Sequence, residues 1–300
     1  MDGVATAPGA GTVLNALATG QGSAFAIDVE TTATVELSAD AETVTGSVAN
    51  APDADTRLIE RCVERVVDRF GDGEGGTVVT DSEVPMAAGL KSSSAAANAT
   101  VLATLDALGV DVVGDAAAGD TDDAAAGDAI TKPDACRIGV AAARDVGVTI
   151  TGAFDDAAAS MLGGVVVTDN TEDALLARET REWDVLVWTP PERAYSADAD
   201  VDRCENVAEM ADLVAELALD GRFGEAMTVN GLAYSAALEF DTDPAVEAMP
   251  HCHGVSLSGT GPSVVAVGEA ASLAPVRELW VERDGTLIET TTRPTGASIQ

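Results

Sequence analysis

A run of small and hydroxyl-bearing residues has the composition of a loop that binds phosphate. Pro85 and Gly89 enclose a tight loop, and three consecutive serines then lead directly into an alanine-rich segment. A helix that starts there offers unpaired backbone N–H groups and the positive end of its dipole, which suit an anion. Serine is also a common helix cap, but three serines exceed what one cap needs. We therefore expect ATP phosphates to be bound by Pro85, Met86, Ala87, Ala88, Gly89, Leu90, Lys91, Ser92, Ser93, Ser94 and Ala95.

A second glycine-rich turn, at 258–263, lies between two short hydrophobic runs and contains Gly259, Thr260 and Gly261. Glycine lets the backbone come close to a ligand, because no side chain stands in the way. The same residue types also make ordinary strand connections. We expect these three residues to contact phosphate or substrate, and a simple connection is the alternative.

Two adjacent acids, Asp155 and Asp156, follow the sequence Thr-Gly-Ala-Phe and precede a run of small residues. A carboxylate in such a segment can accept the proton of a hydroxyl group during phosphoryl transfer, or orient the hydroxyl group. In a chain this acidic, either residue could instead belong to a solvated surface. Both are candidates for the catalytic residue, and the sequence does not choose between them.

The elements that must position these residues mix without a regular βαβ repeat, which predicts an α+β fold. Apolar residues at helical spacing predict helices, and β-branched runs predict strands. The expected helices span 56–70, 92–108, 135–146, 207–219 and 224–237, with another near Ala274. The expected strands span 29–37, 77–80, 148–151, 165–168, 185–188, 255–258, 264–267 and 287–292. Residues 7–11 are predicted to form a tight turn, and 114–128 a solvated loop or a frayed extension of a helix.

Charge is the strongest global signal. The chain has 51 acidic and 16 basic residues, a formal net charge of -35, and its lysines are Lys91 and Lys132. The acids are spread along the whole sequence, which favours a solvated coat adapted to a salt-rich cytoplasm over a localised binding face. Binding of nucleic acid is not expected, because no basic patch is available to neutralise phosphates.

The remaining composition indicates neither a secreted nor a membrane protein. Four widely spaced cysteines form no CxxC pair, and the segment His251–Cys252–His253 lacks a further histidine that would complete a zinc site. The sequence shows no signal peptide and no uninterrupted apolar run of membrane-spanning length. We expect a cytoplasmic protein without membrane contact, whose oligomeric state the sequence does not indicate.

Taken together and in this order, the motifs resemble those of the GHMP kinases, a family named for galactose, homoserine, mevalonate and phosphomevalonate kinases. Residues 85–93, with the pattern P-x-x-x-G-L-x-S-S, are similar to the family's phosphate loop. Residues 258–263 are similar to its C-terminal glycine motif, and 7–10 look like its first motif. Within the family, 14–20, 89–98 and 149–156 most resemble the archaeal shikimate kinases.

The resemblance implies two α+β halves with the active site in the cleft between them. The N-terminal half, 1–168, would be like domain 2 of ribosomal protein S5, and the C-terminal half, 169–300, ferredoxin-like. The implied reaction transfers the γ-phosphoryl group of ATP, with Mg²⁺, to the 3-hydroxyl group of the small molecule shikimate, a step of aromatic amino-acid biosynthesis. Ser93 matches the serine that contacts magnesium and phosphate. Comparison with mevalonate kinases matches Asp156 to the catalytic aspartate, and comparison with homoserine kinases matches Asp155.

Two other functions remain open. The chain could be a GHMP kinase of the homoserine or mevalonate type. It could also be a catalytically silent ATP-binding module, because Ala141, Ala142 and Ala143 stand where some relatives carry a metal-binding glutamate. A substrate carboxylate would need a cation, for which the candidates are Arg137, Arg144, Arg193 and Arg293. Weaker candidates for contacts to substrate hydroxyl groups are Asn98, Asn230 and Tyr234.

Overall fold

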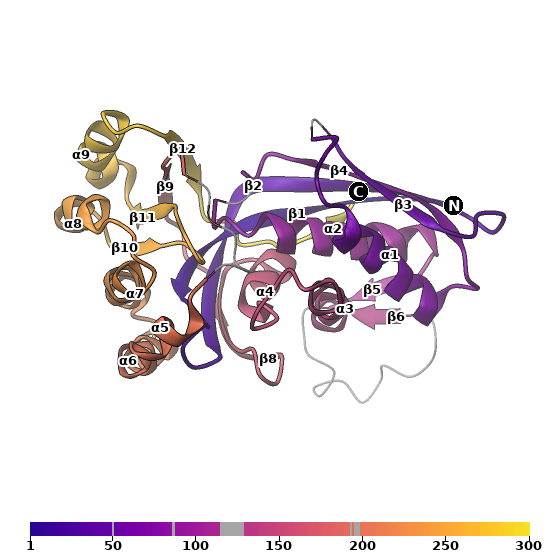
Figure 1. The fold of residues 1–300 in the computed structure, drawn as a ribbon, viewed down its shortest axis with the longest axis horizontal. Helices are drawn as coiled ribbons and strands as arrows, with labels where there is room; N and C mark the ends of the chain where they lie inside the picture. The colour runs from indigo at the N-terminus through magenta and orange to yellow at the C-terminus, as the bar shows by residue number, and fades with distance from the viewer. Residues whose placement is uncertain (50, 86–87, 115–128, 193, 195–198) are drawn as a thin grey trace.

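The computed structural model describes residues 1–49, 51–85, 88–114, 129–192, 194 and 199–300, and its two main sheets lie toward opposite ends of the molecule (Figure 1). The first sheet contains β1 (Asp2–Leu14), β2 (Gln21–Ser38), β3 (Val44–Val48), β4 (Gly75–Ser82), β7 (Val165–Asp169), β8 (Ala174–Glu179) and β13 (Ser298–Ile299). The second sheet contains β9 (Asp184–Thr189), β10 (Gly254–Leu257), β11 (Val264–Gly268) and β12 (Thr286–Thr291). A short separate pair is formed by β5 (Asp111–Val113) and β6 (Ala129–Thr131).

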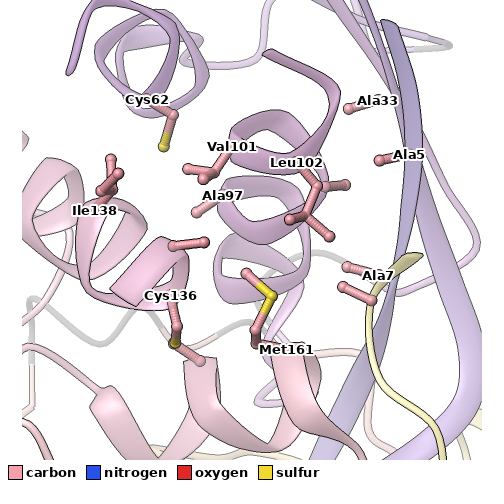
Figure 2. Close-up of a cluster of buried hydrophobic side chains, with 14 of the residues drawn as sticks. Ala5, Ala7, Ala33, Cys62, Ala97, Val101, Leu102, Cys136, Ile138 and Met161 are labelled. Atoms are coloured by element: carbon pink, nitrogen blue, oxygen red, sulfur yellow. The ribbon is translucent and has the colours of Figure 1, made fainter. Parts of the chain in front are cut away.

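Helix α2 (Ser92–Ala107) is the centre of the first half. Its sequence of alanine, threonine and leucine has no polar face, so the helix is buried on nearly all sides. Its neighbours are the first sheet, α1 (Arg57–Phe70), α3 (Lys132–Val146) and α4 (Phe154–Leu162), and Figure 2 shows buried hydrophobic side chains from all of them around it. A Cβ atom at Gly3 would overlap the backbone of Ala103 in α2, so this helix lies very close to β1.

Helices cover the second sheet as well. In β9 the three consecutive residues Val185, Leu186 and Val187 are buried, as expected for a strand that is covered on both faces. Leu186 faces a cluster with Leu273 and Trp280 from the helices on one side. The helices of this half are α5 (Val201–Glu205), α6 (Ala208–Leu219), α7 (Phe223–Ala237), α8 (Asp243–Ala248), the 3₁₀ turn η2 (Met249–His251) and α9 (Ala270–Val281).

The long hairpin of β1 and β2 joins the two halves. Its far end carries Val13, Leu14 and Phe25, which pack in one core cluster with side chains of β9, β11, α6 and α7. The chain ends on the first sheet, because β13 pairs with β1 after the second sheet is complete (Figure 1). The proposed division at 168/169 falls in the hairpin of β7 and β8, both of which belong to the first sheet.

The predicted α+β fold is confirmed, and each predicted helix has its counterpart within three residues of the expected bounds. Most predicted strands are present, and the second strand is longer than expected. Strands β1, β3, β5, β6, β8 and β13 and helices α4, α5 and α8 have no counterpart among the helices and strands predicted above. Except for Gly114, the segment 114–128 lies outside the described residues. Among the described residues, no helix combines the length and the apolar character that crossing a bilayer requires.

The predicted turn at 7–11 is wrong, because these residues lie within β1. The pairing with β2 jumps from Pro8 opposite Glu30 to Ala10 opposite Ala26, which is a bulge. Proline and glycine are tolerated in a strand at such an irregularity, so the same residues that signal a turn here mark a bulge.

The predicted strand at 148–151 is also wrong. The segment is a loop in which Gly152 donates its N–H to Thr149 Oγ1 and Ala153 donates its N–H to Thr151 Oγ1. Threonine hydroxyl groups that bind nearby backbone in this way stabilise turns. The loop ends where α4 begins, so it places both aspartates in the first turn of a helix.

Candidate active site

The serine-rich run starts α2, as its composition predicts. Gly89 and Lys91 both have left-handed backbone conformations, with φ of 76° and 65°. Such a conformation is strained for lysine, and strain of this kind is concentrated at functional sites. Of the serines, Ser93 is exposed and Ser94 is nearly buried at the start of the helix. Met86 and Ala87 lie outside the described residues.

The two glycine motifs lie against each other, although they are far apart in sequence. Ser258 Oγ donates a hydrogen bond of 2.8 Å to the carbonyl oxygen of Gly89. A Cβ atom at Gly89 would overlap the carbonyl oxygen of Ser258, so glycine is required for this close approach. The turn at 258–263 is therefore part of the same site as the loop before α2.

Lys91 connects all three motifs. Its side chain is only 6% exposed, and its Nζ atom lies 2.9 Å from Asp156 Oδ1. A Cβ atom at Gly259 would lie 2.7 Å from the same Nζ atom, so that glycine leaves the space that the ammonium group occupies. The structure thus brings the serine-rich run, the glycine turn and the acidic pair together around one buried cation.

The two aspartates have different surroundings. Asp156 lines a small pocket and is paired with Lys91. Asp155 is 4% exposed, packs against Gly22 and accepts a hydrogen bond of 2.7 Å from Asn170 Nδ2. Burial, together with the charge of Asp156, raises the pKa of Asp155 to about 7.

The pocket of about 50 Å³ lies at the start of α2. Its polar lining includes Ser93, Ser94 and Asp156, and its opposite wall is formed by Gly139, Val140 and Ala143 of α3. This arrangement can accept an anion at the serines and a hydroxyl group at the carboxylate.

The same residues fit a magnesium ion only as an open site. Among the described residues, no three His, Cys, Asp or Glu side chains gather into a cage for a metal. Ser93 and Asp156 offer oxygen ligands, and the α3 wall offers none. Magnesium commonly keeps several waters and binds together with substrate phosphates, so this set is sufficient for a shared ion.

Asn230 and Tyr234, which sequence suggested for substrate contacts, instead hold Asn15. Asn230 Oδ1 accepts the N–H of Asn15, and Tyr234 OH donates to its carbonyl oxygen. Asn15 Nδ2 in turn donates to the carbonyl oxygen of Gly259 at 2.8 Å. The network fixes the glycine turn relative to the β1–β2 hairpin. Asn98 is buried and donates to the carbonyl oxygen of Ala157 in α4.

The described arginine candidates are all paired with carboxylates, and Arg144 also lies against Gly152 of the pocket lining. Arg144 forms a two-bond ion pair with Asp173, and Arg293 pairs with Glu30. Arg137 pairs with Asp134 and also donates to a backbone carbonyl group. Arg193 lies outside the described residues. Lys91, which sequence reasoning placed only in the phosphate loop, is the cation paired with the pocket carboxylate of Asp156.

Solved structures share this fold over almost the whole chain. Homoserine kinase from Cytophaga hutchinsonii superposes with a TM-score of 0.72 at 14% identity, covering 100% of this chain and 97% of that one. Mevalonate kinase from Methanococcus jannaschii superposes with a TM-score of 0.73 at 12% identity, covering 96% and 98%. Residues 57–164 match the family model of the GHMP kinases N terminal domain. The fold and the phosphate-loop half are those of the GHMP kinases, which use ATP.

The sequence similarity reaches further. Shikimate kinase from Halobacterium salinarum is 62% identical over 297 residues, which cover 99% of each chain. Shikimate kinase from Methanosarcina mazei is 46% identical over 301 residues, covering 99% of this chain and 96% of that one. The chain belongs to the family of archaeal shikimate kinases.

Proposed function

We propose that the protein phosphorylates the 3-hydroxyl group of shikimate with ATP and releases shikimate 3-phosphate and ADP. The observation that carries this proposal is the 62% identity to a shikimate kinase over 99% of both chains. The site supports it, because an anion-binding helix start, a carboxylate and a buried cation meet at one pocket. The ATP phosphates bind at 85–95 and the substrate binds near Gly259, between the proposed halves 1–168 and 169–300.

Asp156 is the proposed general base. It faces the pocket, whereas Asp155 is enclosed by Gly22 and Asn170. As the oxygen of the 3-hydroxyl group bonds to the γ-phosphorus and the bond to ADP breaks, the hydroxyl proton passes to Asp156. Lys91 positions this carboxylate and balances its charge. Asp155, with its raised pKa, supports the first turn of α4 and is the alternative base.

Ser93 is the proposed protein ligand for magnesium, because its hydroxyl group is exposed at the start of α2. A bound Mg²⁺ ion would neutralise charge on the phosphates that transfer involves. The backbone N–H groups of the first turn of α2 orient the phosphate chain, with the glycine turn opposite them. Ser94, which is nearly buried, shapes the floor of the phosphate site.

A coupled assay of ADP release tests the function. The purified protein is incubated with ATP and Mg²⁺ in molar potassium chloride, with shikimate, homoserine or mevalonate as the acceptor. We expect turnover with shikimate alone. Turnover of another alcohol in place of shikimate would reassign the substrate. Nucleotide binding without transfer to any acceptor would indicate a silent ATP-binding module.

Replacing Gly259 by alanine should lower kcat about 100-fold, because a new methyl group displaces the Lys91 ammonium group by a fraction of an ångström or more. The affinity for ADP, measured by calorimetry, should change much less. Gly109→Ala is the matched control, since Gly109 also has a positive φ but open space where the Cβ atom would be. Equal losses of activity in both variants would show that backbone strain, and not Lys91, causes the effect.

The raised pKa of Asp155 predicts a pH dependence of stability. Its carboxyl group has an ordinary pKa of 3.8 and a pKa of about 7 in the folded protein. Between these values the folded state holds a proton that the unfolded state has lost, so the free energy of unfolding falls as the pH rises from about 4 to about 7. Asp155→Asn removes this titration and should stabilise the protein at pH 8.

Denaturant unfolding at several pH values, at a fixed concentration of potassium chloride, measures the effect. The wild-type protein should lose stability toward neutral pH relative to Asp155→Asn, and the two curves should converge near pH 4. Parallel curves at all pH values would show that Asp155 titrates normally.

A further inference from the structure

A groove between α1 and α3 is lined by four arginines and two aspartates, Asp68 and Asp134, so arginines outnumber acids there although the chain as a whole is strongly acidic. Its volume is about 650 Å³. Arg61, Arg65 and Arg69 stand four residues apart on α1, so they share one face of the helix, and Arg137 faces them from α3. These are four of the 16 basic residues in a chain with a net charge of -35.

The carboxylates in and around the groove leave much of the arginine hydrogen-bonding capacity unused. Arg61 and Arg65 share Asp145, Arg61 also pairs with Glu64, and Arg137 pairs with Asp134. The hydrogen bonds from Arg65 and Arg61 hold the pKa of the Asp145 carboxyl group down to about 2. Arg69 forms no ion pair with a described residue and lies 4.9 Å over the ring of Phe70. Each guanidinium group has five N–H donors, and the hydrogen bonds of Arg61 and of Arg65 to carboxylates engage two nitrogen atoms each. Their side chains are about one third exposed, at 33% and 32%.

We propose that this groove is a second ligand site, which binds a small molecule with two or more carboxylate or phosphate groups. Planar guanidinium groups bind such anions through paired hydrogen bonds that survive in salt better than single long-range attractions. The volume lies in the range of small-molecule sites, about 300–1,000 Å³. The acidic surface elsewhere repels an anion, so the groove is the favourable place for it.

The groove is connected to the active site through α3 and Arg137. The opposite side of α3 supplies Gly139, Val140 and Ala143 to the phosphate pocket. Arg137 lies 5.5 Å over the ring of Phe154, the residue directly before the two aspartates.

Hydrogen bonds continue the connection. Arg137 donates to the carbonyl oxygen of Asp173, whose carboxylate is paired with Arg144. Arg144 also donates to the carbonyl oxygen of Asn170, and Asn170 holds Asp155. An anion that engages Arg137 would therefore alter the hydrogen bonding of Asp155, which supports the helical turn that carries the proposed base Asp156, so the site regulates the kinase. This regulatory part rests on the proposed function, and the binding part does not.

The competing explanation is purely structural. In it, Arg61, Arg65 and Asp145 only fasten α1 to α3. The two explanations differ at Arg69, which takes no part in that ion-pair network. If the arginines only joined α1 to α3, replacing Arg69 would not affect anion binding. If the groove binds an anion, the N–H donors of Arg69 contribute to it.

Calorimetric titration of the full chain with potassium citrate, and separately with potassium pyrophosphate, tests the site at constant ionic strength. Saturating ADP is present to occupy the loop before α2. We expect at least one probe to bind the wild-type protein, and Arg69→Gln to weaken that binding about tenfold, the effect of about one charge-assisted hydrogen bond. Arg57→Gln is the matched control, because Arg57 is on the same helix, outside the groove, and should bind as the wild type does.

No binding of either probe to the wild-type protein, or equal binding by Arg69→Gln, would overturn the proposal. Which probe binds shows whether the groove prefers carboxylate or phosphate. The regulatory part predicts that the bound probe changes the KM for shikimate at least about threefold in the wild type and in Arg57→Gln, but not in Arg69→Gln. Binding without any kinetic change would refute regulation. If ADP did not bind, the proposed kinase function would be contradicted. The titration with citrate or pyrophosphate would still test anion binding in the groove.

Discussion

Asp156→Asn should lower kcat for shikimate phosphorylation by about three orders of magnitude. Asparagine keeps the shape of the side chain but cannot accept the hydroxyl proton, and a positioned base contributes about 10²–10⁴-fold to a rate. It also gives up the ion pair with Lys91. Steady-state kinetics in molar potassium chloride measures the loss, and calorimetry should show that ADP still binds with an affinity within about threefold of the wild type.

Asp155→Asn is the matched comparison on the neighbouring position. The carboxyl group of Asp155 has a pKa of about 7, so near neutral pH much of it is protonated and resembles an amide. Its hydrogen bond from Asn170 survives, because asparagine also has an acceptor oxygen. We expect kcat to fall by no more than about tenfold. A larger loss at Asp155 than at Asp156 would assign the base to Asp155.

Lys91→Met should be the second most damaging substitution. It leaves the partly buried carboxylate of Asp156 without its partner, which costs about 3 kcal/mol of stability. It also removes the cation that holds this carboxylate at the pocket, so kcat/KM should fall about 100-fold or more. Denaturant unfolding and steady-state kinetics measure the two effects.

Two further variants test the cause. Lys132→Met changes the charge equally at the chain's other lysine, outside the pocket, and should be close to the wild type in kcat/KM. The double variant Lys91→Met/Asp156→Asn should recover most of the lost stability, because no unpaired charge remains. If the double variant were as unstable as the sum of both single variants, the ion pair would not be what stabilises this region.

Local sequence patterns predicted the elements that carry the site. Leu58, Cys62 and Val66 recur at helical spacing, and α1 has the bounds that this spacing indicates. The serine-rich run correctly predicted the start of α2, because the tendency of a helix to begin at such residues is local. The prediction of a turn at 7–11 was wrong because proline and glycine occur both in turns and in β-bulges. Only the pairing with β2 distinguishes the two.

The arrangement of the site depended on contacts that no local pattern contains. Lys91 and Asp156 are 65 residues apart in the sequence, and they meet only because α2 and α4 pack side by side on the first sheet. The rarity of lysine in this chain was the signal that could have singled out Lys91. Asn15 could have been noticed as a single amide side chain directly after a buried strand. Its role in the site became visible only from its long-range hydrogen bond with Asn230.

The pairing of β13 with β1 in the first sheet has a consequence for how the protein folds during its synthesis. Ala297 donates its N–H to the carbonyl oxygen of Ser160 at the end of α4, and β13 then completes the edge beside β1. During translation, β1 in the half that emerges first therefore keeps an unpaired edge until residues 297–300 have left the ribosome.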